Sequence, residues 1–466
     1  MHQEFRATLS ARDQKTNVEH QLSLPGGAER IRLRLAFPRG PGLGHMLCLS
    51  LFDGAGFRGS GHRGGALHEV RLSSTEATPG YLPGAVPPGT VSILIHAHRI
   101  ADGEACPYRL DVEWEGNGKS ESSRIAELAV SSDLASARTL AAVPAWYRGD
   151  LHSHTVHSDG DWTKRELLSA ARKAGLDFIA VTDHNTVSHL FDDGALGAGI
   201  GASDAGNGPD PLVIAGMELT TFHGHALSLG TRAWIDWGAM PGGRSMPQIA
   251  AEVTRLGGYF VIAHPHSEGD PTCTGCDWRI AEMMPGSSPA VEVWNGPWGG
   301  DSHNEDALAL WYRWLNEGRR LVATAGSDAH GPLGLVGSVG RNVVWADALS
   351  EQAVLRSIAA GRLYVSSGPH LDLSAERGAR IAGVGESLPG SGQSPGASAA
   401  EIRLGWRGCP PGAVVRLVTD GTVAADIPAE GDGTWRWERV SARWCTVEVR
   451  ERSGILLAVA NPVFLA

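Results

Sequence analysis

Hydrophobic and polar residues alternate along the first 120 positions in short runs separated by glycine and proline. Examples of these runs are 30-RIRLRLAF-37, 91-VSILIHAH-98 and 108-YRLDVEWEG-116. A period of two places successive side chains on opposite faces of a β-strand, and turn residues about every ten positions are typical of a β-sandwich. We therefore predict an N-terminal β-sandwich-like domain over residues 1–120, followed by a linker over 121–146.

The pattern changes from about residue 147, where apolar runs alternate with segments of helical periodicity. The runs 177-DFIAVTDHN-185 and 212-LVIAGMELTT-221 predict strands, whereas 163-TKRELLSAARKAGL-176 and 305-EDALALWYRWLNEG-318 predict helices. Strand–helix alternation implies a parallel sheet or barrel, so residues 147–370 are predicted to form an α/β domain. Period-two alternation returns in the tail, which predicts a C-terminal β-rich domain over 371–466.

Composition limits the classes of function. A chain of 466 residues suggests two or three domains. The net charge of -11 argues against binding to a nucleic-acid duplex or a membrane surface. The chain has no apolar run long enough to span a bilayer, and its first residues do not resemble a secretory signal. We expect a cytoplasmic protein that acts on a small-molecule substrate, and the sequence assigns no oligomeric state.

The six cysteines are sparse for this length and do not indicate a disulfide framework. The pair in 273-CTGC-276 has zinc-knuckle spacing, but no second CxxC completes a four-thiolate site. We interpret this segment as a turn close to the site formed by the neighbouring histidines.

Side chains able to bind metal ions stand at the ends of apolar runs in the central region. His152 and His154 are two positions apart, so a strand would point both imidazoles to one face. In α/β barrels the active site gathers at the carboxyl ends of the strands. A lone HxH motif is weak evidence, but the same residue types at successive strand ends indicate a metal centre. These residues are His152, His154, His184, Glu218, His264, Asp328 and His330.

The motifs HxH, SDG, TDHN, GxE, HP and GSDAH follow one another along residues 147–370. In this order they resemble the polymerase-and-histidinol-phosphatase (PHP) superfamily. The resemblance implies an α/β fold, a distorted (β/α)7 TIM-like barrel, here flanked by N-terminal and C-terminal β-sandwich-like domains. It also implies two to three divalent metal ions. Within the superfamily, 216-GMELTTFHGHALSLG-230 and 291-VEVWNGPW-298 resemble the carbaryl-hydrolase-like (CehA/McbA) branch, which includes aryl carbamate esterases.

The resemblance also implies a set of ligands. The first metal would be held by His152, His154, Glu218 and Asp328, and the third by Asp159, His184 and His330. Glu218 would bridge to a second metal, which His264 also binds. Asp159 stands where several relatives place a histidine, one residue later. A further ligand of the second metal is expected at His303, with Asn295 and Glu292 as alternatives.

Other residues near these motifs are candidates for catalysis or substrate binding. Besides Glu218, the candidate catalytic residues are His225 and His266, either of which could instead orient a metal ligand. The candidate substrate contacts are His157, Asn185, Trp298 and Arg341; Arg341 could pair with an anionic substrate, and Trp298 could form an apolar wall.

The expected reaction is hydrolysis by a hydroxide shared between metal ions. The mixed ligand set leaves zinc, manganese and iron open. We expect a phosphoesterase acting on a phosphodiester or phosphomonoester, with carbamate or aryl carboxylic ester hydrolysis as the alternative. An amidohydrolase-type barrel would need a bridging lysine, yet Lys164 and Lys173 both fall in the first helical pattern. A degenerate barrel that only binds a ligand is a further alternative.

Overall fold

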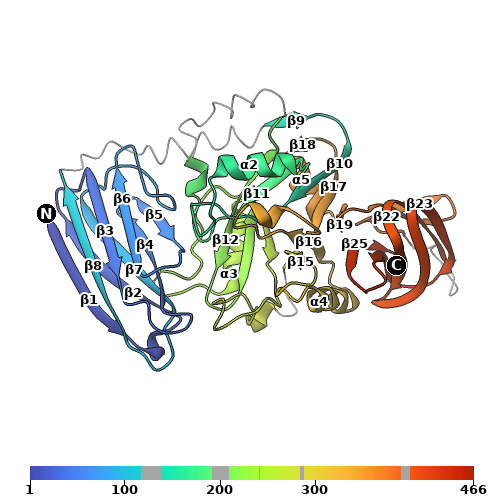
Figure 1. The fold of residues 1–466 in the computed structure, drawn as a ribbon. Helices are drawn as coiled ribbons and strands as arrows, with labels where there is room; N and C mark the ends of the chain where they lie inside the picture. Colours follow the sequence, from blue (N-terminus) through green and yellow to red (C-terminus); the bar gives the residue numbers. More distant parts are fainter. Residues whose placement is uncertain (117–137, 192–208, 241, 284–287, 390–398, 466) are drawn as a thin grey trace.

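The computed structural model describes residues 1–116, 138–191, 209–240, 242–283, 288–389 and 399–465. N-terminal sheets, a central α/β region and C-terminal strands follow one another along the molecule (Figure 1). Residues 121–137 of the predicted linker lie outside the described residues. In its remaining part, 138–146, the structure has β9 (Thr139–Ala141) and the start of β10 (Ala145–Asp150). Among the described helices, none is both long and apolar enough to cross a membrane.

The first 115 residues form two four-stranded antiparallel sheets, with orders β1-β8-β3-β6 and β2-β7-β4-β5. Alternate side chains such as Leu33, Leu49 and Ile95 fill one core between the two sheets. The strands are β1 (His2–Leu9), β2 (Thr16–Leu24), β3 (Arg30–Ala36), β4 (Met46–Asp53), β5 (Gly56–Gly61), β6 (Leu67–Ser73), β7 (Gly89–Arg99) and β8 (Cys106–Glu115).

The central sheet is mixed, whereas strand–helix alternation predicted a parallel one. Two parallel sets, β10-β11-β12 and β14-β15-β16, flank β13, which is antiparallel to both neighbours. Only residues 221–224 connect β12 to β13, too few for a crossover between parallel strands, so the two strands form a hairpin. The strands are β11 (Phe178–Val181), β12 (Leu212–Thr220), β13 (His225–Leu229), β14 (Tyr259–Ile262), β15 (Ala290–Asn295) and β16 (Val322–Gly326).

The helix predicted over 163–176 forms as α2 (Lys164–Lys173), and the helix predicted over 305–318 forms as α4 (Asn304–Asn316). The described residues also include α3 (Met246–Arg255) and α5 (Glu351–Ala359). Thr163 caps the start of α2 with a capping box. Its hydroxyl accepts a hydrogen bond from the Glu166 N–H, and the Glu166 carboxylate accepts one from the Thr163 N–H. Ser350 caps α5 by accepting from the Ala353 N–H.

The two edges of the central run of strands meet at their carboxyl ends. The Asp328 N–H, after β16, donates to the His152 carbonyl at 2.9 Å, and the His154 N–H, after β10, donates to the Ala329 carbonyl at 3.0 Å. These bonds bring the segments that carry predicted ligands, after the first and last strands of this central run, side by side.

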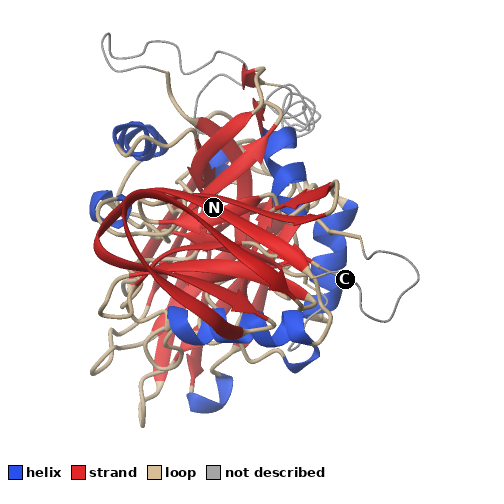
Figure 2. Ribbon diagram, turned by 90° about the vertical axis from the view of Figure 1, so that its right-hand side faces the viewer, coloured by secondary structure: helices blue, strands red, loops and turns tan. Residues whose placement is uncertain are grey.

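The C-terminal strands continue the central sheet. β17 (Arg341–Ala346) pairs with β10, β19 (Leu363–Ser366) with β17, and β25 (Leu456–Ala460) with β19. The predicted boundary at residue 370 therefore falls within one hydrogen-bonded sheet of mostly antiparallel tail strands (Figure 2). The other strands of this sheet are β20 (His370–Arg377), β21 (Arg380–Gly383), β22 (Ala400–Thr419), β23 (Thr422–Val440), β24 (Trp444–Arg450) and β26 (Val463–Phe464). β18 (Leu349–Ser350) instead pairs with β9 in a separate two-stranded sheet.

Candidate metal centre

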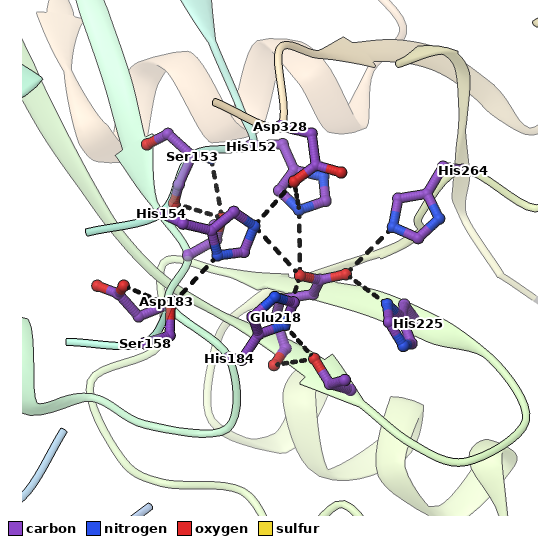
Figure 3. Close-up of polar contacts among 12 residues, drawn as sticks. His152, Ser153, His154, Ser158, Asp183, His184, Glu218, His225, His264 and Asp328 are labelled. Carbon is purple, nitrogen blue, oxygen red and sulfur yellow. Dashed lines mark hydrogen bonds and ion pairs between the residues drawn. The ribbon is translucent and has the colours of Figure 1, made fainter. Parts of the chain in front are cut away.

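Glu218 lies at the centre of a buried cluster of histidines (Figure 3). It stands near the end of β12, and His225 begins the antiparallel strand β13, so the hairpin brings both to the same edge of the sheet. The other members follow β10, β11, β14 and β16. They are His152, His154, His184, His264 and Asp328.

The two carboxylate oxygens of Glu218 face different histidines. Oε2 lies 3.2 Å from His152 Nε2, 3.3 Å from His154 Nε2 and 2.9 Å from His184 Nδ1. Oε1 lies 2.9 Å from His225 Nδ1 and 3.2 Å from His264 Nε2. One carboxylate thus reaches ligands on both sides, as a group that bridges two cations must.

Asp328 and Asp159 extend the cluster in two directions. Asp328 Oδ1 lies 2.9 Å from His154 Nε2 and 3.4 Å from His152 Nε2. Asp159 Oδ1 lies 3.4 Å from His184 Nε2 and 3.3 Å from His330 Nε2. Donor atoms of His154, Asp159, His184 and His330 all lie within 4.8 Å of one another, as do those of His152, His154 and Asp328, and those of His152, Glu218 and His264.

The charges within the cluster shift one another's protonation. Burial alone would raise the pKa of the Glu218 carboxyl, but the imidazoles of His184 and His152 outweigh it and hold that pKa well below its usual range. Burial would lower the pKa of His184, but the Asp159 and Glu218 carboxylates hold it well above the ordinary value. Carboxylates and protonated imidazoles thus neutralise one another in the cluster, and a bound cation would take the place of the protons.

Glu292 and Asp150 contact two of the predicted ligands, His152 and His264. Glu292 is buried on β15, its Oε1 lies 3.0 Å from His152 Nδ1, and its Oε2 accepts from the His264 N–H at 3.0 Å. Asp150 Oδ1 accepts from the His152 N–H at 3.1 Å. Such partners fix the orientation of a metal-binding imidazole.

Two predicted ligands have left-handed backbone conformations. His264 has φ 26° and Asp328 has φ 53°. A side chain other than glycine at such a φ costs about 1–3 kcal/mol, and strained residues of this kind concentrate at functional sites.

Three predicted residues are not among the clustered donor atoms. His303 is exposed and stands before α4 as its N-cap residue, with φ 46°. His266 is half-buried and pairs with the backbone of Asp277. Trp298 is buried against Trp294, with ring centroids 4.9 Å apart, and its carbonyl accepts from Asn304. None of these placements adds support to the roles predicted for these side chains.

The remaining predicted substrate contacts make bonds within the protein. His157 Nδ1 lies 2.7 Å from Ser188 Oγ and accepts from the Gly80 N–H at 3.3 Å, which ties it to the N-terminal domain. Asn185 exchanges bonds with the Thr220 backbone at 2.9 and 3.0 Å. Arg341 is only 2% exposed and forms an ion pair with Asp150, so its guanidinium lies in the interior.

Sequence reasoning missed the contribution of the N-terminal domain. The ring of His62, just after β5, lies 4.5 Å from that of His184, a distance between centroids. No motif in 60-SGHRGG-65 indicates this contact. Cys273 and Cys276 form a disulfide, which the cysteine count did not predict, and Cys276 Sγ lies 3.9 Å from His225 Nδ1. The CxxC segment is thus near the centre, as expected.

Comparisons with known proteins give distant relatives. No family model matches the chain. An uncharacterised protein of Methanocaldococcus jannaschii is 27% identical over 159 residues, which cover 32% of this chain and 81% of that protein.

Three solved structures are also similar to this chain. The first is a two-domain protein from Bacteroides vulgatus that contains a predicted PHP-like metal-dependent phosphoesterase, at 15% identity and TM-score 0.38 over 68% of this chain and 95% of that chain. The second is named as a metal-dependent phosphoesterase from Bifidobacterium adolescentis, at 19% identity and TM-score 0.30 over 45% and 94%. The third is an amidohydrolase from Chromobacterium violaceum with bound sulfate and no metal, at 20% identity and TM-score 0.28 over 41% and 89%.

Proposed function

We propose that this chain is a PHP-superfamily, metal-dependent hydrolase that cleaves phosphoesters. The observation that carries the proposal is the placement of Glu218, whose Oε2 faces His152, His154 and His184 while its Oε1 faces His225 and His264. A structural carboxylate would need one or two such partners. Five imidazoles around one buried carboxylate instead favour a centre built for more than one cation.

Several of the clustered donor atoms have no hydrogen-bond partner in the part of the chain that the structure describes, which favours cations as their partners. His152 Nε2, Glu218 Oε2 and Asp159 Oδ1 are buried and make no hydrogen bond of good geometry among the described residues. Buried polar atoms of this kind are costly unless something else satisfies them. Converging imidazole and carboxylate atoms are suitable ligands for zinc, manganese or iron. We propose two to three divalent ions, held by the ligands that the motifs implied, apart from His303.

When bound, such ions would supply Lewis-acid chemistry that activates water for hydrolysis. The chain's own residues position this chemistry. Glu292 and Asp150 orient His152, and Glu292 also fixes the backbone of His264. His225 faces Glu218 through Nδ1 and the Thr274 carbonyl through Nε2 at 3.1 Å. With both ring nitrogens engaged, His225 is better suited to orienting Glu218 than to protonating a leaving group.

A second candidate reaction is hydrolysis of a carbamate or aryl carboxylic ester. The segment 216–230, which resembles the carbaryl-hydrolase-like branch, forms the β12–β13 hairpin that supplies Glu218 and His225. The same activated water would attack a carbonyl carbon in place of phosphorus. For either reaction we propose a small-molecule substrate and a cytoplasmic location. We propose no nucleic-acid duplex or membrane as a partner, in keeping with the net charge of -11.

The test compares two reporter substrates on metal-loaded protein: bis(p-nitrophenyl) phosphate and 1-naphthyl methylcarbamate. Glu218→Gln is the inactive variant, and Glu282→Gln, at an exposed position, is the matched control. Turnover of the phosphodiester that Glu218→Gln abolishes and Glu282→Gln retains supports the proposal. Turnover of the carbamate alone would favour the second candidate. Full activity of Glu218→Gln would remove the proposed centre from the reaction.

A further inference from the structure

One face of the N-terminal sheet β2-β7-β4-β5 carries polar side chains, yet it is buried. On β4, Leu47, Leu49 and Leu51 face the domain core, so the alternate residues Cys48 and Ser50 point to the opposite face. Both alternate residues are nonetheless buried. The same face carries Ser60, His62, His96 and His98, all buried.

The central region covers this polar face. The His96 ring lies 5.0 Å from that of Trp237, and the His98 ring lies 5.1 Å from that of Phe222. The Thr274 hydroxyl donates to the His98 carbonyl at 3.0 Å. Because His62 also packs on His184, this sheet lies directly over the candidate metal centre.

Three donors on this face form a compact group outside the metal ligands already described. Cys48 on β4 and His62 after β5 are cross-strand neighbours, with Sγ 3.9 Å from Nδ1. The rings of His62 and His98 lie 4.8 Å apart and are nearly perpendicular, at 89°. One donor atom from each of the three residues lies within 4.8 Å of the others.

Both ring nitrogens of the neighbouring His96 have hydrogen-bond partners. Its Nε2 lies 2.8 Å from Ser50 Oγ, and its Nδ1 lies 2.8 Å from Asn17 Oδ1. In contrast, His98 Nδ1 is buried and has no hydrogen-bond partner among the described residues. Leaving such a buried atom unpaired is unfavourable, so the group has a donor atom available for a ligand.

We propose that Cys48, His62 and His98 bind a divalent cation of the zinc type, separate from the ions at Glu218. One thiolate and two imidazoles are donors that zinc prefers, and three protein ligands leave a fourth position open. Zn–S and Zn–N bonds of about 2.3 and 2.0 Å at a tetrahedral angle put sulfur and nitrogen roughly 3.5 Å apart. The 3.9 Å between Cys48 and His62 needs only a small contraction to reach that value.

The test uses cobalt(II), because a cobalt–thiolate bond gives a near-ultraviolet charge-transfer band that imidazole and carboxylate ligands do not give. The full chain is loaded with cobalt without reductant, so that the Cys273–Cys276 disulfide stays closed. The variants are Cys48→Ser, His98→Gln and the matched control Cys106→Ser, which changes another buried cysteine of the same domain.

We expect the wild type to show the band and Cys106→Ser to keep it. Cys48→Ser should lose the band and bind about one cobalt ion fewer per chain. His98→Gln should weaken cobalt binding at this site. It replaces Cys48→Ser as the test variant if circular dichroism shows that Cys48→Ser does not fold. Glu218→Gln should keep the band whether or not the reporters are hydrolysed, which separates this site from the proposed function. A wild type without the band, or a Cys48→Ser protein that keeps it, would overturn the proposal. A band that disappears only in a Cys273→Ser/Cys276→Ser protein would also overturn it.

Discussion

Arg341 and Asp150 form a buried ion pair, and the same Asp150 carboxylate accepts the backbone N–H groups of His152 and Ser327. The pair therefore joins β17 to two segments that carry proposed metal ligands. Replacing Arg341 by Met would leave an unpaired charge in the interior. We expect a loss of about 3–5 kcal/mol in the free energy of unfolding, measured by urea denaturation.

Arg319→Met serves as the comparison, because Arg319 stands on the surface. It should change the free energy of unfolding by less than about 1 kcal/mol. If Arg341→Met were as stable as the wild type and only raised the KM for an anionic substrate, the side chain would be a substrate contact, as the sequence first suggested.

Glu292→Gln should weaken metal binding without removing a proposed ligand. The glutamine can place its oxygen toward only one of its two partners, so either the imidazole of His152 or the N–H of His264 loses its acceptor. We expect metal affinity to fall about 10–100-fold, measured by competition with a coloured chelator. Unchanged affinity would show that Glu292 does not orient these residues.

Metal addition should stabilise the protein. Removing cations leaves the carboxylates and imidazoles to neutralise one another, whereas cations bind the folded arrangement only. A free metal concentration of a hundred times the dissociation constant should add about 2.7 kcal/mol to the free energy of unfolding. The measurement is the rise in Tm when metal is added back to a chelator-treated sample. Glu218→Gln should show a smaller rise, and an equal rise in that variant would point to cations bound elsewhere.

The N-terminal sheet should weaken in acid through His96. Burial lowers the pKa of His96 to about 3, so the folded protein keeps it neutral while the unfolded chain titrates near its ordinary value of 6.5. Its stabilising contribution is therefore present above pH 6.5 and is lost as the pH falls toward 3, by up to about 1.4 kcal/mol per pH unit.

Urea unfolding at pH 7.0 and 5.5 measures this effect. His96→Gln should lose less stability over the interval than the wild type. His303→Gln, which changes an exposed histidine, should match the wild type. Equal losses in His96→Gln and the wild type would mean that other groups carry the acid sensitivity.

The sequence could predict which end of the strands carries the centre. The rule that active-site residues gather at the carboxyl ends of strands places His152, His154 and Asp328 at one end of the sheet. It does not predict their contact, because both histidines follow β10 and backbone bonds between the segments after β10 and β16 bring Asp328 to them. The hairpin turn at 221–224 escaped prediction, because 225-HALSL-229 reads as a continuation of the ligand-bearing segment.

Contacts between domains could not be predicted in the same way. Alternation in 91-VSILIHAH-98 indicates that His96 and His98 share the polar face of a strand. It does not tell whether water or another domain covers that face. Arg341 shows the reverse case, in which a charged residue next to glycine looks exposed but pairs with Asp150 across two strands that are 191 residues apart in the chain.

The pairing of β19 with β25 joins the central region and the C-terminal strands in one hydrogen-bonded sheet. A chain cut after Ser366 would expose the backbone donors and acceptors of β19 as an unpaired edge. Such an edge can pair with any available strand, including that of a second truncated molecule. We therefore expect a fragment without the tail to self-associate.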